Sequence, residues 1–176
     1  MNIMLFGISC VGKTTVGKIM AEKLGYQFYD MDEETKKFYN CTLEEFVNGP
    51  YNRYQRDVLR LKLMDHLIKE PGDKVFAITP LAHEEIVQAL LAYENTIGIE
   101  LVDKYMNIYN RMVFSDEEDN IYRDDEYKEA HRDYYIKDIK EDQEFYGVVY
   151  LCVPNQMHVD NLPPEEVADS IIESFL

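Results

Sequence analysis

Positive charge is scarce in this sequence. The 176 residues include 18 Lys and Arg against 34 Asp and Glu, a formal net charge of −16. Because such a surface repels phosphate backbones and anionic lipid headgroups, the composition argues against nucleic-acid and membrane partners. Any site for a phosphate group must therefore be basic locally, against the charge of the whole chain.

Cysteine and long apolar runs are scarce too. The three cysteines, Cys10, Cys41 and Cys152, form no C-x-x-C pair, which favours a reducing cytoplasmic location over a disulfide framework. No segment approaches the ~20 apolar residues of a membrane span. The apolar N-terminus follows no basic stretch and is interrupted by Lys13, so a signal peptide is not expected. Without repeats or flexible linkers, we expect one domain over 1–176.

A phosphate-binding motif lies near the N-terminus. Gly7 to Thr14 fit G-x-x-x-x-G-K-[ST], the P-loop pattern. An apolar segment precedes the motif and apolar residues at helical spacing follow it, so the strand–turn–helix context disfavours a chance match. The motif predicts that Lys13 contacts the β and γ phosphates and that Thr14 ligates Mg²⁺. The predicted nucleotide-binding residues are Gly7, Cys10, Val11, Gly12, Lys13, Thr14 and Thr15.

Apolar periodicity alternates along the rest of the chain. We expect strands at 2–6, 26–29, 74–78, 97–102 and 147–153, and helices at 13–24, 32–39, 42–48, 51–69, 82–93, 104–114 and 163–175. Strands that alternate with helices predict an α/β fold with a parallel sheet and right-handed crossovers.

Two aspartates follow the second expected strand. Ligands bind beyond the carboxyl ends of parallel strands, so Asp30 and Asp32 are expected near the P-loop. One carboxylate can hold the hydration shell of Mg²⁺, and the other can accept a proton from a substrate hydroxyl. The alternative is a helix N-cap, for which Asp is favoured without any catalytic role.

These motifs resemble those of shikimate kinases and their small P-loop kinase relatives. The resemblance rests on the P-loop, on the helix end Ala21–Tyr26, on the F-x-D-x-D segment at 28–32, on Thr42–Phe46 and, more weakly, on Pro163–Asp169. It implies the three-layer fold of P-loop NTP hydrolases and nucleoside-monophosphate kinases, with five parallel strands in the order 2-3-1-4-5. It also implies a substrate-binding subdomain at about 32–70, a lid at about 112–135, and γ-phosphoryl transfer from ATP, with Mg²⁺, to a small-molecule hydroxyl.

The resemblance assigns roles to individual residues. Asp30 resembles the aspartate near Mg²⁺, together with Thr14, and Asp32 resembles the one that orients the substrate hydroxyl. Arg53 lies near the position of the family's carboxylate-binding arginine, with Arg56 as a competitor for that role. Arg132 resembles a second substrate arginine, and two arginines can bind a carboxylate in bidentate fashion. Solvated surface arginines are the alternative.

The chain departs from the family pattern at two glycine positions. Cys10 stands where a third P-loop glycine is usual, and Thr79-Pro80-Leu81 replaces a glycine triplet at the end of the third strand. Side chains there would fill space that shikimate occupies in the family. Thr79 also stands where many P-loop proteins carry an acidic residue, so metal binding would depend on Thr14 and Asp30.

The expected lid is unusually acidic. Eight of the fifteen residues at 115–129 are Asp or Glu, against Arg123 and Lys128. A kinase lid stabilises the transferring phosphoryl group with positive charge, which makes Arg123 the catalytic candidate, with Arg111 approaching from the preceding helix. A solvated acidic loop, or one that docks a cationic substrate or partner, is the alternative.

Two functional hypotheses remain. The first is a cytoplasmic ATP-dependent kinase of a small hydroxylated metabolite, in which Lys13, Asp32 and Arg123 are catalytic and Asp32, Arg53 and Arg132 bind the acceptor. Shikimate is the default acceptor, and a nucleoside, nucleotide or other sugar-like acid is the alternative. The second is a nucleotide-binding module that has lost turnover and acts through protein contacts. Monomer and homodimer both stay open.

Overall fold

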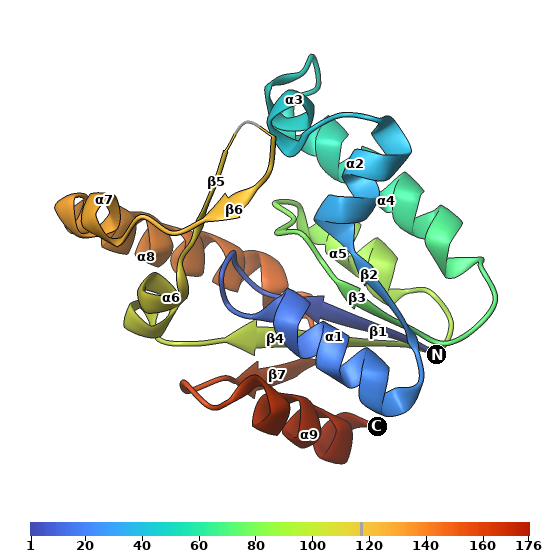
Figure 1. Ribbon diagram of the computed structural model, residues 1–176. Helices are drawn as coiled ribbons and strands as arrows, with labels where there is room; N and C mark the ends of the chain where they lie inside the picture. The colour runs from blue at the N-terminus through green and yellow to red at the C-terminus, as the bar shows by residue number, and fades with distance from the viewer. Residues whose placement is uncertain (117) are drawn as a thin grey trace.

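A parallel sheet forms the centre of the protein, for which a computed structural model describes residues 1–116 and 118–176. Its five strands lie in the order β2-β3-β1-β4-β7 (Figure 1). They are β1 (Asn2–Phe6), β2 (Gln27–Asp30), β3 (Lys74–Ala77), β4 (Thr96–Val102) and β7 (Asn155–His158). The predicted α/β fold and strand order 2-3-1-4-5 are confirmed, since β7 is the fifth strand of this sheet along the chain.

Helices cover both faces of the sheet. Helices α1 (Lys13–Leu24) and α9 (Pro164–Phe175) pack together on one face, and α4 (Arg53–Ile68) and α5 (Glu84–Leu91) pack on the other (Figure 1). The five residues of β1 are all buried between these layers, as expected for the central strand of a parallel sheet. The carboxyl ends of β1, β2 and β3 therefore open toward one edge, where the candidate site lies. No helix within the described residues is long and apolar enough to cross a membrane.

The predicted strand at 147–153 is wrong. Helix α8 (Arg132–Val149) continues through the first part of this segment, and a 3₁₀ turn, η1 (Tyr150–Cys152), follows it. The run is apolar enough for a strand, but Val149 and Tyr150 are buried while Val148 and Leu151 are exposed, so only one side of it faces the core. The true edge strand, β7, has the polar sequence Asn-Gln-Met-His, which lacks the apolar pattern of a buried strand.

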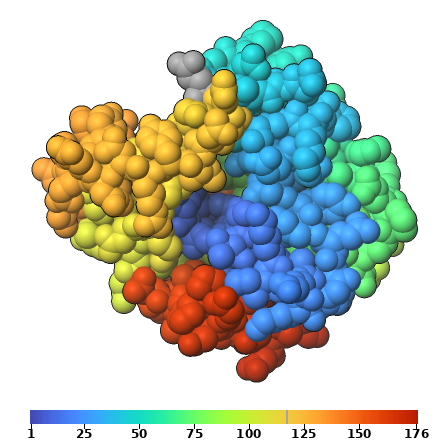
Figure 2. All heavy atoms as spheres, in the orientation of Figure 1, coloured from blue at the N-terminus to red at the C-terminus, as the bar shows by residue number. Residues whose placement is uncertain are grey.

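A small substructure extends from the carboxyl ends of the strands. Helix α6 (Tyr105–Arg111) leads into an antiparallel pair, β5 (Phe114–Ser115) and β6 (Ile121–Tyr122), and then into α7 (Asp125–Ala130). This hairpin lies within the expected lid and reaches toward α2 (Met31–Tyr39) and α3 (Leu43–Asn48), as Figures 1 and 2 show. The boundaries of the lid and of the substrate-binding subdomain stay predictions.

Candidate active site

The P-loop forms a glycine-dependent turn between β1 and α1. Gly7 has φ +130°, and a Cβ there would lie 2.5 Å from the backbone oxygen of Leu101. Gly12 has φ +113° and precedes the first residue of α1, where no described side chain caps the helix. Because the first amides of a helix lack partners within it, this N-terminus can bind an anion.

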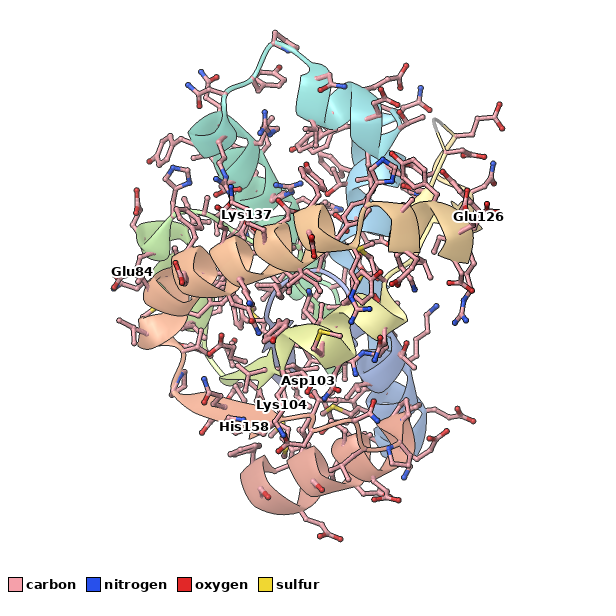
Figure 3. All side chains as sticks on the ribbon, turned by 90° about the vertical axis from the view of Figure 1, so that its left-hand side faces the viewer. Glu84, Asp103, Lys104, Glu126, Lys137 and His158 are labelled. Atoms are coloured by element: carbon pink, nitrogen blue, oxygen red, sulfur yellow. The ribbon has the colours of Figure 1, made fainter. Side chains whose placement is uncertain are left out.

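Cys10 adopts a backbone conformation that glycine would adopt more easily. Its φ is 60°, in the left-handed region that L side chains rarely occupy, which explains why a glycine is usual at this position. The Arg111 guanidinium supports the same residue: Nε donates to the Cys10 oxygen at 3.3 Å, and Nη2 contacts Asp103 at 2.6 Å. Figure 3 shows Asp103 below α8. Arg111 thus links the P-loop to Asp103, which follows β4.

Lys13 lies inside the turn. Its Nζ donates hydrogen bonds to the oxygens of Gly7 and Ile8, both at 2.8 Å. Burial lowers the pKa of Lys13 to about 8, although the nearby negative groups, Asp32 first among them, act in the opposite direction. A desolvated cation that already faces carboxylates is placed to exchange its carbonyl partners for phosphate oxygens.

The two predicted metal ligands are in contact. Thr14 Oγ1 donates to Asp30 Oδ2 at 2.6 Å, while Asp30 Oδ1 accepts from the amides of Asp32 at 3.0 Å and Glu33 at 3.5 Å. Asp30 is therefore the N-cap of α2, and Asp32 lies inside the first helical turn. Hydroxyl and carboxylate oxygens fit the preference of Mg²⁺. The described residues contain no cluster of three or more His, Cys, Asp or Glu that could hold a metal alone, so phosphate oxygens and water would complete the set.

Asp32 faces the interior of the site. Its Oδ1 accepts a hydrogen bond from Thr79 Oγ1 at 2.5 Å. Burial raises the pKa of Asp32, an effect that the Thr79 hydrogen bond and the positive charges of Arg60 and Lys13 oppose and that Asp30 reinforces. The structure thus brings Asp32, Lys13, Thr14 and Asp30 together at the ends of β1 and β2, as the sequence predicted.

The predicted arginines lie elsewhere. Arg53 donates to the Tyr146 hydroxyl at 2.6 Å, and Arg56 donates to the oxygens of Val47 and Tyr51. Arg132 forms an ion pair with Glu129, three residues before it in the chain. Arg123 follows β6 and is exposed. Within the described residues none of these four guanidinium groups bonds to Asp32, and their roles stay predictions.

Arg60, which no sequence motif singles out, is the arginine whose positive charge opposes the rise in the pKa of Asp32. Arg60 is 9 % exposed, its guanidinium lies 5.2 Å from the Phe46 ring centroid, and its Nη1 is 3.4 Å from Asp57 Oδ1. Its buried Nε has no hydrogen-bond partner among the described residues. The sequence holds one indication of this. Asp57 and Arg60 are charged residues on the apolar face of α4 that buries Met64 and Leu67, and charges on a buried face are usually paired or functional.

Asp57 and Tyr150 hold the loop between β3 and α5. The Asp57 carboxylate is 1 % exposed, and its Oδ2 accepts from the Ala82 amide at 2.9 Å and lies 2.7 Å from His83 Nδ1. The Leu81 amide donates to the Tyr150 hydroxyl at 3.1 Å. The loop that carries Thr79 is therefore fixed from two directions.

The acidic hairpin contacts the helices across from the P-loop. Asp119 Oδ2 accepts from the Leu43 amide at 3.0 Å and lies 3.7 Å from Lys36 Nζ. A wide cleft of about 880 Å³ opens between α3 and this segment, lined in part by Glu44, Asp116 and Glu118. Part of the acidic character of the lid thus serves a contact with α2 and α3. The acidic residue at 117 lies outside the described residues.

Comparisons with known proteins agree on one family. A family model described as "Shikimate kinase" matches residues 9–175. The chain is 28 % identical to a shikimate kinase of Bacillus subtilis over 182 residues, which cover 99 % of this chain and 88 % of that protein. The solved shikimate kinase of Aquifex aeolicus superposes with a TM-score of 0.67 at 21 % identity, covering 99 % of this chain and 95 % of that one. The Acinetobacter baumannii enzyme in complex with shikimate gives 0.68 at 19 %, covering 98 % and 90 %. Both structures support the fold.

Proposed function

Because the chain belongs to the shikimate kinase family, we propose that it transfers the γ-phosphoryl group of ATP to a hydroxyl group of shikimate. One observation carries the proposal. The P-loop cation Lys13, the contacting pair Thr14 and Asp30, and the partly buried carboxylate of Asp32 converge at the carboxyl ends of β1 and β2, between which β3 lies. A nucleotide and an acceptor bound on either side of this cluster would meet at the γ phosphate.

The nucleotide half uses backbone and Lys13. The amides at the start of α1 would bind phosphate oxygens, and Lys13 would exchange its bonds to Gly7 and Ile8 for the β and γ phosphates. Thr14 and Asp30 would hold Mg²⁺ together with phosphate oxygens and water. When bound, the ion neutralises charge on the phosphates.

The acceptor half uses Asp32. Its carboxylate would orient the acceptor hydroxyl and take its proton as the oxygen–phosphorus bond forms and the bond between the γ phosphorus and the β–γ bridging oxygen breaks, releasing ADP. Burial raises the pKa of Asp32, which makes the carboxylate a better proton acceptor than an exposed one. Most of the rate enhancement in such a reaction comes from positioning and charge stabilisation.

The acceptor carboxylate needs a cation, and three arginines are proposed for it. Arg53 and Arg132 would have to leave Tyr146 and Glu129. The charge of Arg60 already acts on Asp32, and its buried Nε has no hydrogen-bond partner among the described residues. Arg123, on the exposed segment after β6, is the proposed lid cation, which a closing movement would bring to the phosphates.

The test is acceptor-dependent product formation. The protein is incubated with ATP, Mg²⁺ and either shikimate, gluconate or a nucleoside, and phosphorylated product is detected by mass spectrometry. We expect phosphorylated shikimate, and a loss of kcat of about 10²- to 10⁴-fold in Asp32→Asn. Glu33→Gln, an exposed neighbour on the same helical turn, is the matched control and should keep full activity. Product from gluconate or the nucleoside alone would overturn shikimate as the acceptor, and no product from any would overturn the kinase assignment.

A further inference from the structure

Asp32 is held by a hydroxyl group from another part of the chain. Thr79 follows β3, and its Oγ1 donates to Asp32 Oδ1 at 2.5 Å across 47 residues of sequence. No hydrogen bond to the second oxygen, Oδ2, occurs among residues 1–116 and 118–176. Oδ1 thus has a hydrogen-bond partner, whereas Oδ2 has none among the described residues. The bond to Oδ1 fixes the orientation of the carboxylate and therefore the position of Oδ2.

The backbone on both sides of Thr79 is anchored. Before it, the Ile78 amide extends the pairing with β1 by donating to the Leu5 oxygen at 2.9 Å. After it, Pro80 restricts the backbone, and the Leu81 and Ala82 amides donate to Tyr150 and Asp57. A hydroxyl on such a segment is preorganised, because little conformational freedom is lost when it binds its partner.

Charged neighbours alone would not fix this orientation. Lys13 of α1 and Arg60 of α4 attract the carboxylate, Asp30 at the end of β2 repels it, and Lys36 of α2 adds a weaker attraction. Such forces are spread over several directions, whereas a short hydrogen bond selects one oxygen and one rotamer.

We propose that Thr79 is a positioning residue of the phosphoryl-transfer site: its hydroxyl holds Oδ1 of Asp32 so that Oδ2 faces the hydroxyl of the acceptor. The inference rests on the proposed function, since it takes Asp32 as the group that orients the acceptor. Thr79 acts through Asp32, not on the reacting atoms.

The experiment separates the hydroxyl of Thr79 from its bulk. Thr79→Val keeps the branched shape and removes the hydrogen bond, whereas Thr79→Ser keeps the hydroxyl and removes a methyl group. For Thr79→Val we expect kcat/KM for shikimate to fall about tenfold, mostly in kcat, with KM for ATP changed less than twofold. Thr79→Ser should stay within about threefold of wild type. Thr96→Val, which removes a buried hydroxyl without a partner at the start of β4, is the matched control and should not change either constant.

Two results would overturn the inference alone, given wild-type turnover. One is a Thr79→Val protein as active as wild type. The other is an equal loss in both variants, which would mean that the site needs the volume of Thr79 and not its hydroxyl. If Thr79→Val fails to fold, Thr79→Ala is compared with Thr79→Ser instead. The inference then requires Thr79→Ala to lose kcat/KM for shikimate while Thr79→Ser, which keeps the hydroxyl, does not. A wild-type protein that neither binds nor phosphorylates shikimate would overturn the proposed function and this inference together.

Discussion

The two halves of the candidate cleft are built in different ways. The phosphate half consists of backbone geometry: two glycines with positive φ, an uncapped helix N-terminus and Lys13 bonded to carbonyl oxygens. The acceptor half consists of side chains drawn from separate elements: Thr79 donates to Asp32, the charge of Arg60 acts on Asp32, and Asp57 pairs with Arg60.

This difference has a consequence for specificity. A phosphate tail is common to all nucleoside triphosphates, so a backbone cradle can be encoded in one short motif. An acceptor is recognised by groups that the fold assembles from distant positions. Substitutions in the first half should therefore abolish nucleotide use, and those in the second should change acceptor use while nucleotide use persists.

The largest effect is expected from Lys13→Ala. Removing the cation that would face the β and γ phosphates should lower kcat/KM for ATP by about 10³-fold. Lys18→Ala, on an exposed position of the same helix, is the control and should change it little. Steady-state kinetics with ATP as the varied substrate measure the effect. Similar values for the two variants would break the comparison, because the phosphate half would then not depend on its lysine.

Asp57→Asn should damage the acceptor half alone. The variant leaves the buried guanidinium of Arg60 with less compensation and weakens the hold on Ala82 and His83, so we expect the free energy of unfolding to fall by about 3 kcal/mol. KM for shikimate should rise, with KM for ATP unchanged. Denaturant unfolding and two-substrate kinetics measure both effects. Asp65→Asn, at a more exposed carboxylate of the same helix, is the control. A rise in KM for ATP equal to that for shikimate would contradict the division.

Asp103→Asn tests how the ion pair between Asp103 and Arg111, which contacts the P-loop at Cys10, contributes to stability at different pH values. Burial alone would raise the pKa of Asp103, but hydrogen bonds from Asn107, Arg111 and the Lys104 amide lower it below its ordinary value of 3.8. A depressed pKa contributes stability that is present above the unfolded value and is lost as the pH falls through the folded one.

The variant should therefore be about 2 kcal/mol less stable than wild type at pH 7, and the gap should narrow below pH ~4. Thermal unfolding at several pH values measures the gap. Asp138→Asn, an exposed carboxylate on α8, should show no such gap. A gap of equal size at pH 7 and pH 3 would mean that the carboxylate charge is not responsible.

Cys10→Gly should have the smallest effect. Glycine relieves the left-handed strain at φ 60° but adds freedom to the unfolded chain, so the two contributions nearly cancel and stability should change by less than ~1 kcal/mol. Activity should be retained. Thermal unfolding and kinetics measure both. A large loss of activity would show that the thiol itself takes part in the phosphate half.

The two halves also differ in how far the sequence predicts them. The P-loop and the two aspartates follow a strand directly, so a local pattern places Lys13, Thr14, Asp30 and Asp32 correctly. The end of the third strand also places Thr79 near the acceptor, but no local pattern predicts its bond to Asp32. Arg60 lies in the middle of α4, and no motif singles it out. Arg53 has suitable chemistry and lies near the expected position, with a spacing from Phe46 that is shorter than usual, and the Tyr146 hydroxyl of α8 accepts from its guanidinium.

The fold shows the same limit at its edge. Buried central strands such as β1 are visible in the sequence as apolar runs. The polar strand β7 is not, because an edge strand buries fewer side chains, while the apolar end of α8 imitates a strand. Local hydrophobicity reports burial, so it does not by itself separate a polar edge strand from a loop or a half-buried helix end from a strand.

The most direct test of the account is the rate of ADP release from ATP, measured with and without shikimate. If the backbone-built half holds the nucleotide and the half around Asp32 presents the acceptor, ADP release should depend on shikimate and saturate with it, with one phosphorylated acceptor per ADP. ADP release at the same rate in the absence of shikimate, or none in its presence, would contradict the account.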